Sequence, residues 1–227
     1  MAFNARDLAV NGVRALQPYQ PGKPVEELER ELGLSDIVKL ASNENPRTSN
    51  EVIAKALAQQ QSDISRYPDG SGYALKIRLS DLLGVSTDQL TLGNGSNDVL
   101  ELLVRAFVCP GQGVVVSEHS FAVYSLAASA VGADLKTAPA RSWGHDLDAI
   151  LSLVDQNTRV VFIANPNNPT GTWVESRALL AFLDHMPSTT IVVIDEAYYE
   201  YCEDPDFPNA IDLMKDYPFL VSTRTFS

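Results

Sequence analysis

The chain is poor in basic residues, in cysteine and in long apolar runs. Its 227 residues include 17 Lys and Arg against 29 Asp and Glu, which gives a formal net charge of −12. A nucleic-acid surface needs clustered Lys and Arg, so we expect none here. No stretch approaches the ~18 consecutive apolar residues of a membrane helix, and the amino terminus has no apolar signal core. The sequence therefore predicts a cytoplasmic protein without nucleic-acid or membrane partners.

The few cysteines and histidines form no recognisable site. Cys109 and Cys202 lack the CxxC or Cys/His spacing of a zinc site, and two isolated cysteines make no disulfide framework. The three histidines are scattered, and the Gly-x-Ser-x-Gly motif of serine hydrolases is absent. We therefore expect neither a metal centre nor a Ser-His-Asp hydrolase.

From residue 89 onward, short apolar runs alternate with amphipathic stretches. This alternation predicts parallel strands joined by crossover helices, and therefore an α/β fold with a helix-covered sheet. The expected strands are residues 89–92, 114–117, 133–137, 160–164, 191–194 and 219–222. The expected helices are residues 97–107, 122–131, 146–154 and 176–185. Before residue 89 the alternation is weaker, with a strand expected at 37–41 and helices at 50–60 and 73–83.

Two of these strands lead into polar groups that suit a pyridine cofactor. The apolar run 191–194 stops at Asp195, shortly before Tyr198, and the run 160–164 leads to Asn168. Open α/β sheets bind ligands at the carboxyl ends of their strands, so these side chains should meet at one edge. The ring of pyridoxal phosphate needs an acid at its nitrogen and hydrogen-bond donors near its phenolic oxygen. The three residues have the chemistry for those roles.

Two features of the same region also fit other proteins. Asp195 and Glu196 after four apolar residues resemble the acid pair of a nucleotide hydrolase, but no segment supplies the Gly-x-x-x-x-Gly-Lys-Ser/Thr loop. Residues 93–98 follow a predicted strand and open a helix, where backbone N–H groups attract phosphate. The alternative there is an ordinary turn with Ser96 as N-cap. A nucleotide-hydrolysing or non-catalytic α/β protein is therefore the rival from another class.

Four segments carry a family resemblance. They are residues 18–24 (PYQPGKP), 39–46 (KLASNENP), 66–70 (RYPDG) and 222–227 (STRTFS). With the turn at residues 165–171 they resemble the fold-type I aminotransferases, and within them the histidinol-phosphate aminotransferase family. The resemblance implies a pyridoxal-phosphate enzyme that transfers an amino group between histidinol phosphate and 2-oxoglutarate in histidine biosynthesis. The alternative of the same fold is an aromatic aminotransferase or a phospho-amino-acid decarboxylase.

The resemblance also implies a role for each site residue. It assigns Asp195 to the pyridine nitrogen, Asn168 and Tyr198 to the phenolic oxygen, and Phe121 to the face of the ring. The implied phosphate ligands are Gly95, Ser96, Asn97, Thr225, Ser227 and, from the partner subunit of a homodimer, Tyr67. Tyr19 and Asn43 are the implied lining of a pocket for an amino donor and a phosphorylated keto acceptor. Arg224 has a weaker claim to the phosphate, with an ion pair as the alternative, and Arg66 has no assigned role.

Finally, the resemblance divides the chain and shows where it departs from the family. Residues 1–70 would form an amino-terminal arm and part of a small domain, and residues 71–227 an incomplete large cofactor-binding domain. The Schiff-base lysine of the family is expected directly after Ser227, and the carboxyl-terminal small domain would follow it. Either the polypeptide ends at Ser227, or a covalently modified lysine interrupts the written sequence; we favour the second. Arg47, Thr48 and Ser49 replace an apolar, glycine-containing stretch after Pro46.

Overall fold

The computed structural model of the chain describes residues 8–17, 22–40, 42–45, 51–61 and 64–227. The chain forms two compact units. The larger comprises Met1–Gln17 with Asp88–Ser227, and the smaller comprises Pro18–Thr87. The division expected at residue 70 stays a prediction, because it separates the functional domains of the resembling family, whereas the two units are separated by how compactly each one packs.

The smaller unit is helical where it is described. Its helices are α2 (Val25–Leu32), α3 (Glu51–Gln60) and α4 (Tyr73–Leu83). The helices predicted at 50–60 and 73–83 are confirmed, and α2 was not predicted. The strand predicted at 37–41 is wrong for residues 37–40, which form no strand; residue 41 lies outside the described residues. A strand requires a neighbour for its backbone hydrogen bonds, and these residues have no paired strand.

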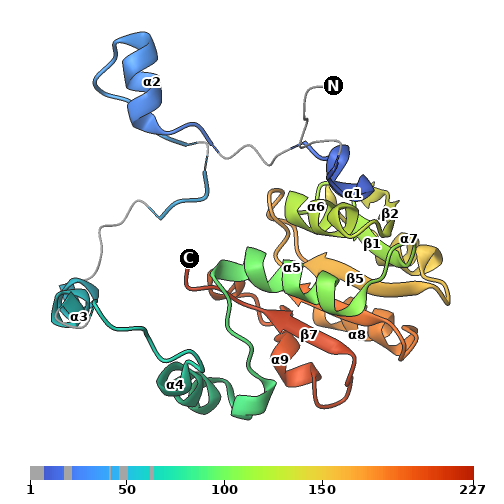
Figure 1. Cartoon of the computed structure of the whole chain (residues 1–227). Coiled ribbons are helices and arrows are strands. Elements are labelled where there is room, and N and C mark those ends of the chain that lie inside the picture. Colours follow the sequence, from blue (N-terminus) through green and yellow to red (C-terminus); the bar gives the residue numbers. More distant parts are fainter. Residues whose placement is uncertain (1–7, 18–21, 41, 46–50, 62–63) are drawn as a thin grey trace. The chain divides into compact units, whose positions relative to one another are not determined.

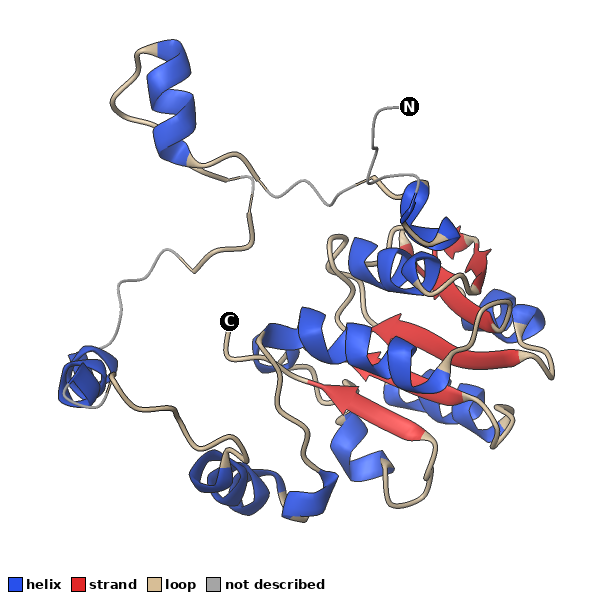
Figure 2. Cartoon of the chain, in the orientation of Figure 1, coloured by secondary structure: helices blue, strands red, loops and turns tan. Residues whose placement is uncertain are grey.

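The larger unit is built on a parallel five-stranded sheet (Figures 1 and 2). Its strands are β1 (Gly113–Ser117), β2 (Asp134–Ala138), β5 (Thr158–Ala164), β6 (Ile191–Asp195) and β7 (Leu220–Thr223), in the order β2-β1-β5-β6-β7. These are the strands predicted from residue 114 onward. The strand predicted at 89–92 is wrong. A 3-10 turn, η3 (Thr87–Gln89), precedes irregular backbone there, which pairs with no strand of the sheet.

Helices cover both faces of this sheet. One face carries α5 (Gly95–Phe107) and α6 (Ala122–Ala130), and the short α1 (Asn11–Arg14) contacts α6. The other carries α7 (Leu147–Leu153), α8 (Ser176–Asp184) and α9 (Ala210–Leu213). The predicted helices of this unit are confirmed, whereas α1, α9 and the hairpin β3 (Ala140–Arg141) and β4 (Gly144–His145) were not predicted. No helix within the described ranges is long and apolar enough to cross a membrane.

The two covered faces explain why the strands read as continuous apolar runs. In β6, Val193 packs with the helices α5 and α6, whereas Val192 and Ile194 pack in the core beneath α7, α8 and α9. Successive side chains of a strand point to opposite faces, and both faces here are buried.

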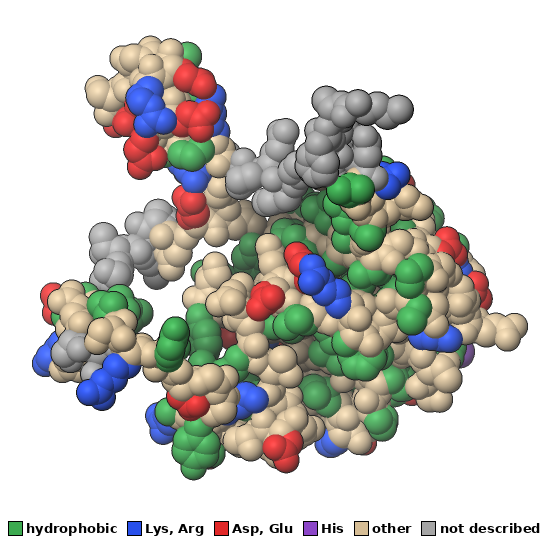
Figure 3. All heavy atoms as spheres, viewed as in Figure 1, with side chains coloured by type: hydrophobic (Ala, Val, Ile, Leu, Met, Phe, Trp, Pro, Cys, Tyr) green, Lys and Arg blue, Asp and Glu red, His purple; other side chains and the backbone are tan. Residues whose placement is uncertain are grey.

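On the outer side of α5, apolar side chains also reach solvent. Leu102 and Phe107 are 45% and 51% exposed, and Figure 3 shows hydrophobic surface on this side of the molecule.

Candidate active site

Asp195 is the last residue of β6 and is buried at the carboxyl end of the sheet. The hydroxyl of Tyr124 donates a hydrogen bond to its Oδ2 at 2.6 Å. The hydroxyl of Thr223 and the backbone N–H of Ala197 donate to its Oδ1, at 3.1 and 3.3 Å. An ionised carboxylate has about four acceptor positions. These three donors therefore leave the carboxylate able to accept one more N–H group.

Burial opposes the charge on this carboxylate. Desolvation raises the pKa of Asp195, and the hydrogen bonds from Tyr124 and Thr223 only partly offset that effect. Burial and the neighbouring charge of Asp195 in turn raise the pKa of the Tyr124 hydroxyl well above its ordinary value, so this group stays a donor. A buried carboxylate is stabilised by a cationic hydrogen-bond donor. A protonated pyridine nitrogen is such a donor, and the site therefore fits the cofactor that the sequence predicts.

Helix α6 supplies the aromatic side of the site. Phe121 is its N-cap, and Tyr124 follows one turn later on the same side of the helix. The Tyr124 ring stacks on Phe162 of β5 with centroids 4.7 Å apart and planes 1° from parallel, and Phe121 meets Tyr124 edge-on at 5.8 Å. The Tyr124 hydroxyl is thus held on Asp195 by packing on two sides. Phe121 was predicted from the sequence and Tyr124 was not, although the three-residue spacing was the available signal.

The turn that contains Asn168 lies directly beside Asp195. The backbone N–H of Asn165 donates to the carbonyl oxygen of Asp195 at 2.9 Å. Asn167 is buried, and its Nδ2 donates to the carbonyl oxygen of His119, in the loop before Phe121, at 3.0 Å. These bonds gather the ends of β1, β5 and β6 at one edge. Asn168 is partly buried within this turn.

The amino terminus of α5 is the candidate phosphate site. The helix begins at Gly95, with Asn94 as N-cap, so the alternative that Ser96 caps it is wrong. The side chain of Asn94 makes no cap hydrogen bond, and the first N–H groups of a helix have no partner within it. Gly95 has φ +78°, a conformation that favours glycine. The backbone N–H of Gly95 donates to the carbonyl oxygen of Gly93 at 2.9 Å, so Ser96 and Asn97 supply the backbone donors that, with the positive end of the helix dipole, suit an anion.

The remaining sites predicted in the larger unit follow β6 and β7. Tyr198 is partly buried and precedes the 3-10 turn η4 (Tyr199–Tyr201), with its ring centroid 6.2 Å from that of Tyr201. Thr225 is half-buried and Ser227 is exposed, and the backbone N–H of Ser227 donates to Thr225 Oγ1 at 3.1 Å. The two hydroxyl residues therefore form one local turn after β7.

The predicted residues of the smaller unit belong to a different compact body from the one that contains Asp195. Asn43, Arg66 and Tyr67 are exposed, and Tyr67 is fully so. Tyr19 lies outside the described residues. Because the two units are compact bodies of their own, the roles of these residues stay predictions.

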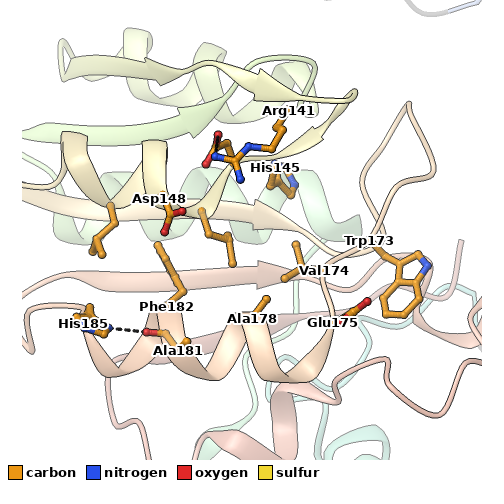
Figure 4. Close-up of a pocket in the computed structure, with 13 residues that line it drawn as sticks. Arg141, His145, Asp148, Trp173, Val174, Glu175, Ala178, Ala181, Phe182 and His185 are labelled. Atoms are coloured by element: carbon orange, nitrogen blue, oxygen red, sulfur yellow. Dashed lines mark hydrogen bonds and ion pairs between the residues drawn. The ribbon is translucent and has the colours of Figure 1, made fainter.

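A pocket on the other helical face does not coincide with this site (Figure 4). It has a volume of about 540 Å³ and lies between the β3–β4 hairpin, α7 and α8. Arg141 and His145 of the hairpin line it on one side. Phe182 of α8, together with Trp173 and Glu175 just before that helix, also lines it. None of the sequence-predicted site residues lines this pocket. We therefore locate the candidate chemistry at Asp195 rather than in this cavity.

The sequence profile described as "Aminotransferase class I and II" matches residues 35–227. This match covers most of the chain, including Asp195, the turn at Asn168 and the start of α5. The chain therefore belongs to the class I and II aminotransferase family.

Individual relatives refine this result. The chain is 54% identical, over its full length, to "Histidinol-phosphate aminotransferase 2" of Pseudomonas fluorescens (strain Pf0-1), of which it covers 62%. It is 52% identical, over 99% of its length, to "Histidinol-phosphate aminotransferase 1" of Idiomarina loihiensis, of which it covers 61%. The crystal structure of histidinol-phosphate aminotransferase from Sinorhizobium meliloti in complex with pyridoxal-5'-phosphate matches 96% of the chain and 58% of its own, with TM-score 0.86 and 30% identity. The chain spans about three fifths of the length of these relatives.

Proposed function

We propose that the protein is a pyridoxal-phosphate-dependent aminotransferase that converts imidazole acetol phosphate and glutamate to histidinol phosphate and 2-oxoglutarate, in histidine biosynthesis. Two curated relatives above 50% identity carry this activity in their names. The observation that carries the chemical part of the proposal is the buried carboxylate of Asp195. Its pKa is raised, and three donors leave one of its about four acceptor positions for a cationic donor.

In this proposal each residue has a defined task. Pyridoxal phosphate, when bound, supplies an electron sink for the bond broken at the substrate. Asp195 holds a proton on the ring nitrogen, and Tyr124 and Thr223 keep its carboxylate in place. Phe121 covers the ring, and Asn168 and Tyr198 donate to the phenolic oxygen. The phosphate ligands are Gly95, Ser96, Asn97, Thr225, Ser227 and Tyr67.

The substrate-directed tasks rest on the family resemblance. Asn43 and Tyr19 line the pocket for the amino donor and the phosphorylated keto acceptor. Proton transfer at the substrate carbon belongs to the lysine that the family carries directly after the segment resembling Thr225–Ser227. Substrate choice depends partly on further residues of the family's carboxyl-terminal domain. An aromatic aminotransferase or a phospho-amino-acid decarboxylase is therefore the second candidate within the same fold.

The proposed assembly is a cytoplasmic homodimer in which Tyr67 reaches the phosphate site of the partner subunit. Exposed apolar side chains support an assembly in general. In the larger unit these include Phe107, and in the smaller unit Leu40 is 88% exposed and Tyr67 is fully exposed. Such side chains suit burial against another surface.

A spectroscopic experiment tests the proposal. The protein incubated with pyridoxal phosphate should turn yellow, and glutamate should bleach the colour because the amino group moves to the cofactor. Imidazole acetol phosphate should restore the colour. A protein that stays colourless with added cofactor, or that hydrolyses ATP, would refute the aminotransferase. Restoration by an aromatic keto acid but not by the phosphorylated ketone would favour the aromatic alternative, and release of CO₂ from a phospho-amino acid the decarboxylase.

A further inference from the structure

Glu196 is a buried acid that the proposed chemistry does not use. It follows Asp195 and is 1% exposed, yet it points to the face covered by α9. Its Oε1 accepts the backbone N–H of Ala210 at 2.9 Å, and its Oε2 accepts the hydroxyl of Ser222 at 2.5 Å and Nε of Arg224 at 3.2 Å. The carboxylate therefore binds the start of α9, one residue of β7 and the residue directly after β7 at once.

Arg224 is the cationic half of this cluster. Its Nη2 donates to Oδ1 of Asn209 at 2.8 Å, and its guanidinium lies 3.7 Å from the centroid of the Tyr199 ring. Nε is committed to Glu196. A guanidinium held by two hydrogen bonds and an aromatic face has a fixed orientation, which a flexible ammonium group would lack. The side chain is only 20% exposed, so little water competes for these contacts.

This cluster and the candidate cofactor site hold alternate residues of one segment. Ser222 and Arg224 bond to Glu196, whereas Thr223 between them donates to Asp195 on the opposite face. β7 ends at Thr223, and Arg224 directly precedes Thr225. The segment that carries the proposed phosphate ligands Thr225 and Ser227 is thus anchored immediately before them.

We infer that Glu196 and Arg224 are positioning residues that fix the turn after β7, so that Thr225 and Ser227 present their donors to the cofactor phosphate. The inference rests on the proposed function and deepens it. A buried ion pair adds little stability, because the cost of desolvation offsets the attraction between the charges. Apolar side chains of similar volume often stabilise a fold equally well or better. It does fix geometry, since each charge requires its partner in one place. The cluster is bonded to the residues directly before the proposed phosphate ligands, whose positions it can therefore set.

The test separates the phosphate from the ring. Pyridoxal 5'-phosphate and pyridoxal, which lacks the phosphate, are titrated into the protein, and quenching of protein fluorescence gives the two dissociation constants. The dissociation constant of pyridoxal divided by that of pyridoxal 5'-phosphate measures what the phosphate contributes to binding. In Glu196→Gln this ratio should fall about tenfold, which is the effect of losing one hydrogen bond to a charged group, while the affinity for pyridoxal should change little. A merely structural role would weaken both ligands together.

A second variant and a matched control complete the design. Arg224→Lys keeps a cation against Glu196 and so preserves folding, but it cannot hold Asn209 and Glu196 at once; its ratio should lie between those of the wild type and Glu196→Gln. Asp155→Asn makes the same carboxylate-to-amide change in the ion pair with Lys136, before β5 at the other end of the sheet, and should leave the ratio unchanged.

The outcomes are distinct. An unchanged ratio in both cluster variants, or equal weakening of pyridoxal and pyridoxal 5'-phosphate, overturns the positioning role. If Glu196→Gln does not fold, Arg224→Lys alone decides between these results. A wild-type protein that binds neither ligand overturns the proposed function, whereas a wild-type preference for the phosphorylated ligand that the variants retain overturns only the role of the pair.

Discussion

Asp195 and Glu196 are adjacent in sequence but their carboxylates lie on opposite faces of the sheet. Asp195 is held by Tyr124 of α6, and Glu196 by the backbone N–H of Ala210 at the start of α9. The separation follows from the period of two along a strand. One acid is thereby available to a ligand at the edge of the sheet, while the other binds the segment that completes the site.

Asp195 should be essential to activity and dispensable for folding. Asp195→Ala should keep its circular dichroism spectrum but lose roughly a thousandfold or more in kcat, the scale on which removing a preorganised charge acts. Asp195→Asn should be nearly as severe, because an amide cannot stabilise a protonated ring nitrogen as a carboxylate does. Asn168→Ala and Tyr198→Phe should be milder. An Asp195→Ala protein that retains half its activity would remove this residue from the ring nitrogen.

The α/β fold was predictable because its signal is local. The strands β1, β5 and β6 are apolar on both faces, and the helices between them are amphipathic, so period and length decide these elements. The wrong strands at 37–40 and 89–92 show the limit of that signal. A short apolar run forms a strand only if a neighbouring strand is available to pair with it, and that pairing depends on residues far away in the sequence.

The site was only half predictable for a related reason. Asp195 and Asn168 end predicted strands, and the topology of a parallel sheet brings such ends together. Tyr124, Thr223 and the Glu196–Arg224 pair act through contacts between elements, which no local pattern encodes. The roles carried over for Tyr19, Asn43 and Tyr67 came from resemblance alone.

Stability of the cofactor-free protein should depend on pH through Asp195. Burial raises the folded-state pKa of this carboxyl, so its contribution is full below the ordinary aspartate pKa and is lost as pH rises through the folded value. Asp195→Asn removes that dependence. The free energy of unfolding of the wild type minus that of the variant should therefore decrease as pH rises above the ordinary aspartate pKa, by at most about 1.4 kcal/mol per pH unit.

Asp155→Asn provides the matched control for this measurement. The hydrogen bond from Lys136 lowers the pKa of Asp155 to about 2, so its contribution is present above the ordinary value and is lost only as pH falls toward that number. Urea unfolding should give a constant difference for Asp155→Asn over the range in which the difference for Asp195→Asn decreases. Equal slopes for both variants would contradict the burial effect at Asp195.

Gly95 should matter to phosphate binding beyond its backbone strain. Gly95→Ala forces a side chain into a left-handed conformation, at a cost of about 1 kcal/mol, and moves the N–H groups that begin α5. Gly111 has nearly the same φ, +80°, and equally open space around its added Cβ, so Gly111→Ala is a matched control. Both variants should lose similar stability, but only Gly95→Ala should weaken pyridoxal 5'-phosphate relative to pyridoxal. Equal affinities for pyridoxal 5'-phosphate in the two variants would exclude a phosphate site at the start of α5.

Mixing two impaired variants tests whether Tyr67 acts across a dimer. Tyr67→Phe removes the proposed hydrogen bond to the phosphate and should lower activity by about tenfold or more. Asp195→Ala spoils the ring-nitrogen contact in its own subunit. If Tyr67 serves the partner's site, a mixed dimer combines both lesions in one site and leaves the other intact, so activity should rise when the two proteins exchange subunits. The control is each variant carried through the same exchange alone. Demonstrated subunit exchange without any recovery would mean that Tyr67 serves its own subunit's site or neither, because every site in the mixed dimer would then carry one lesion.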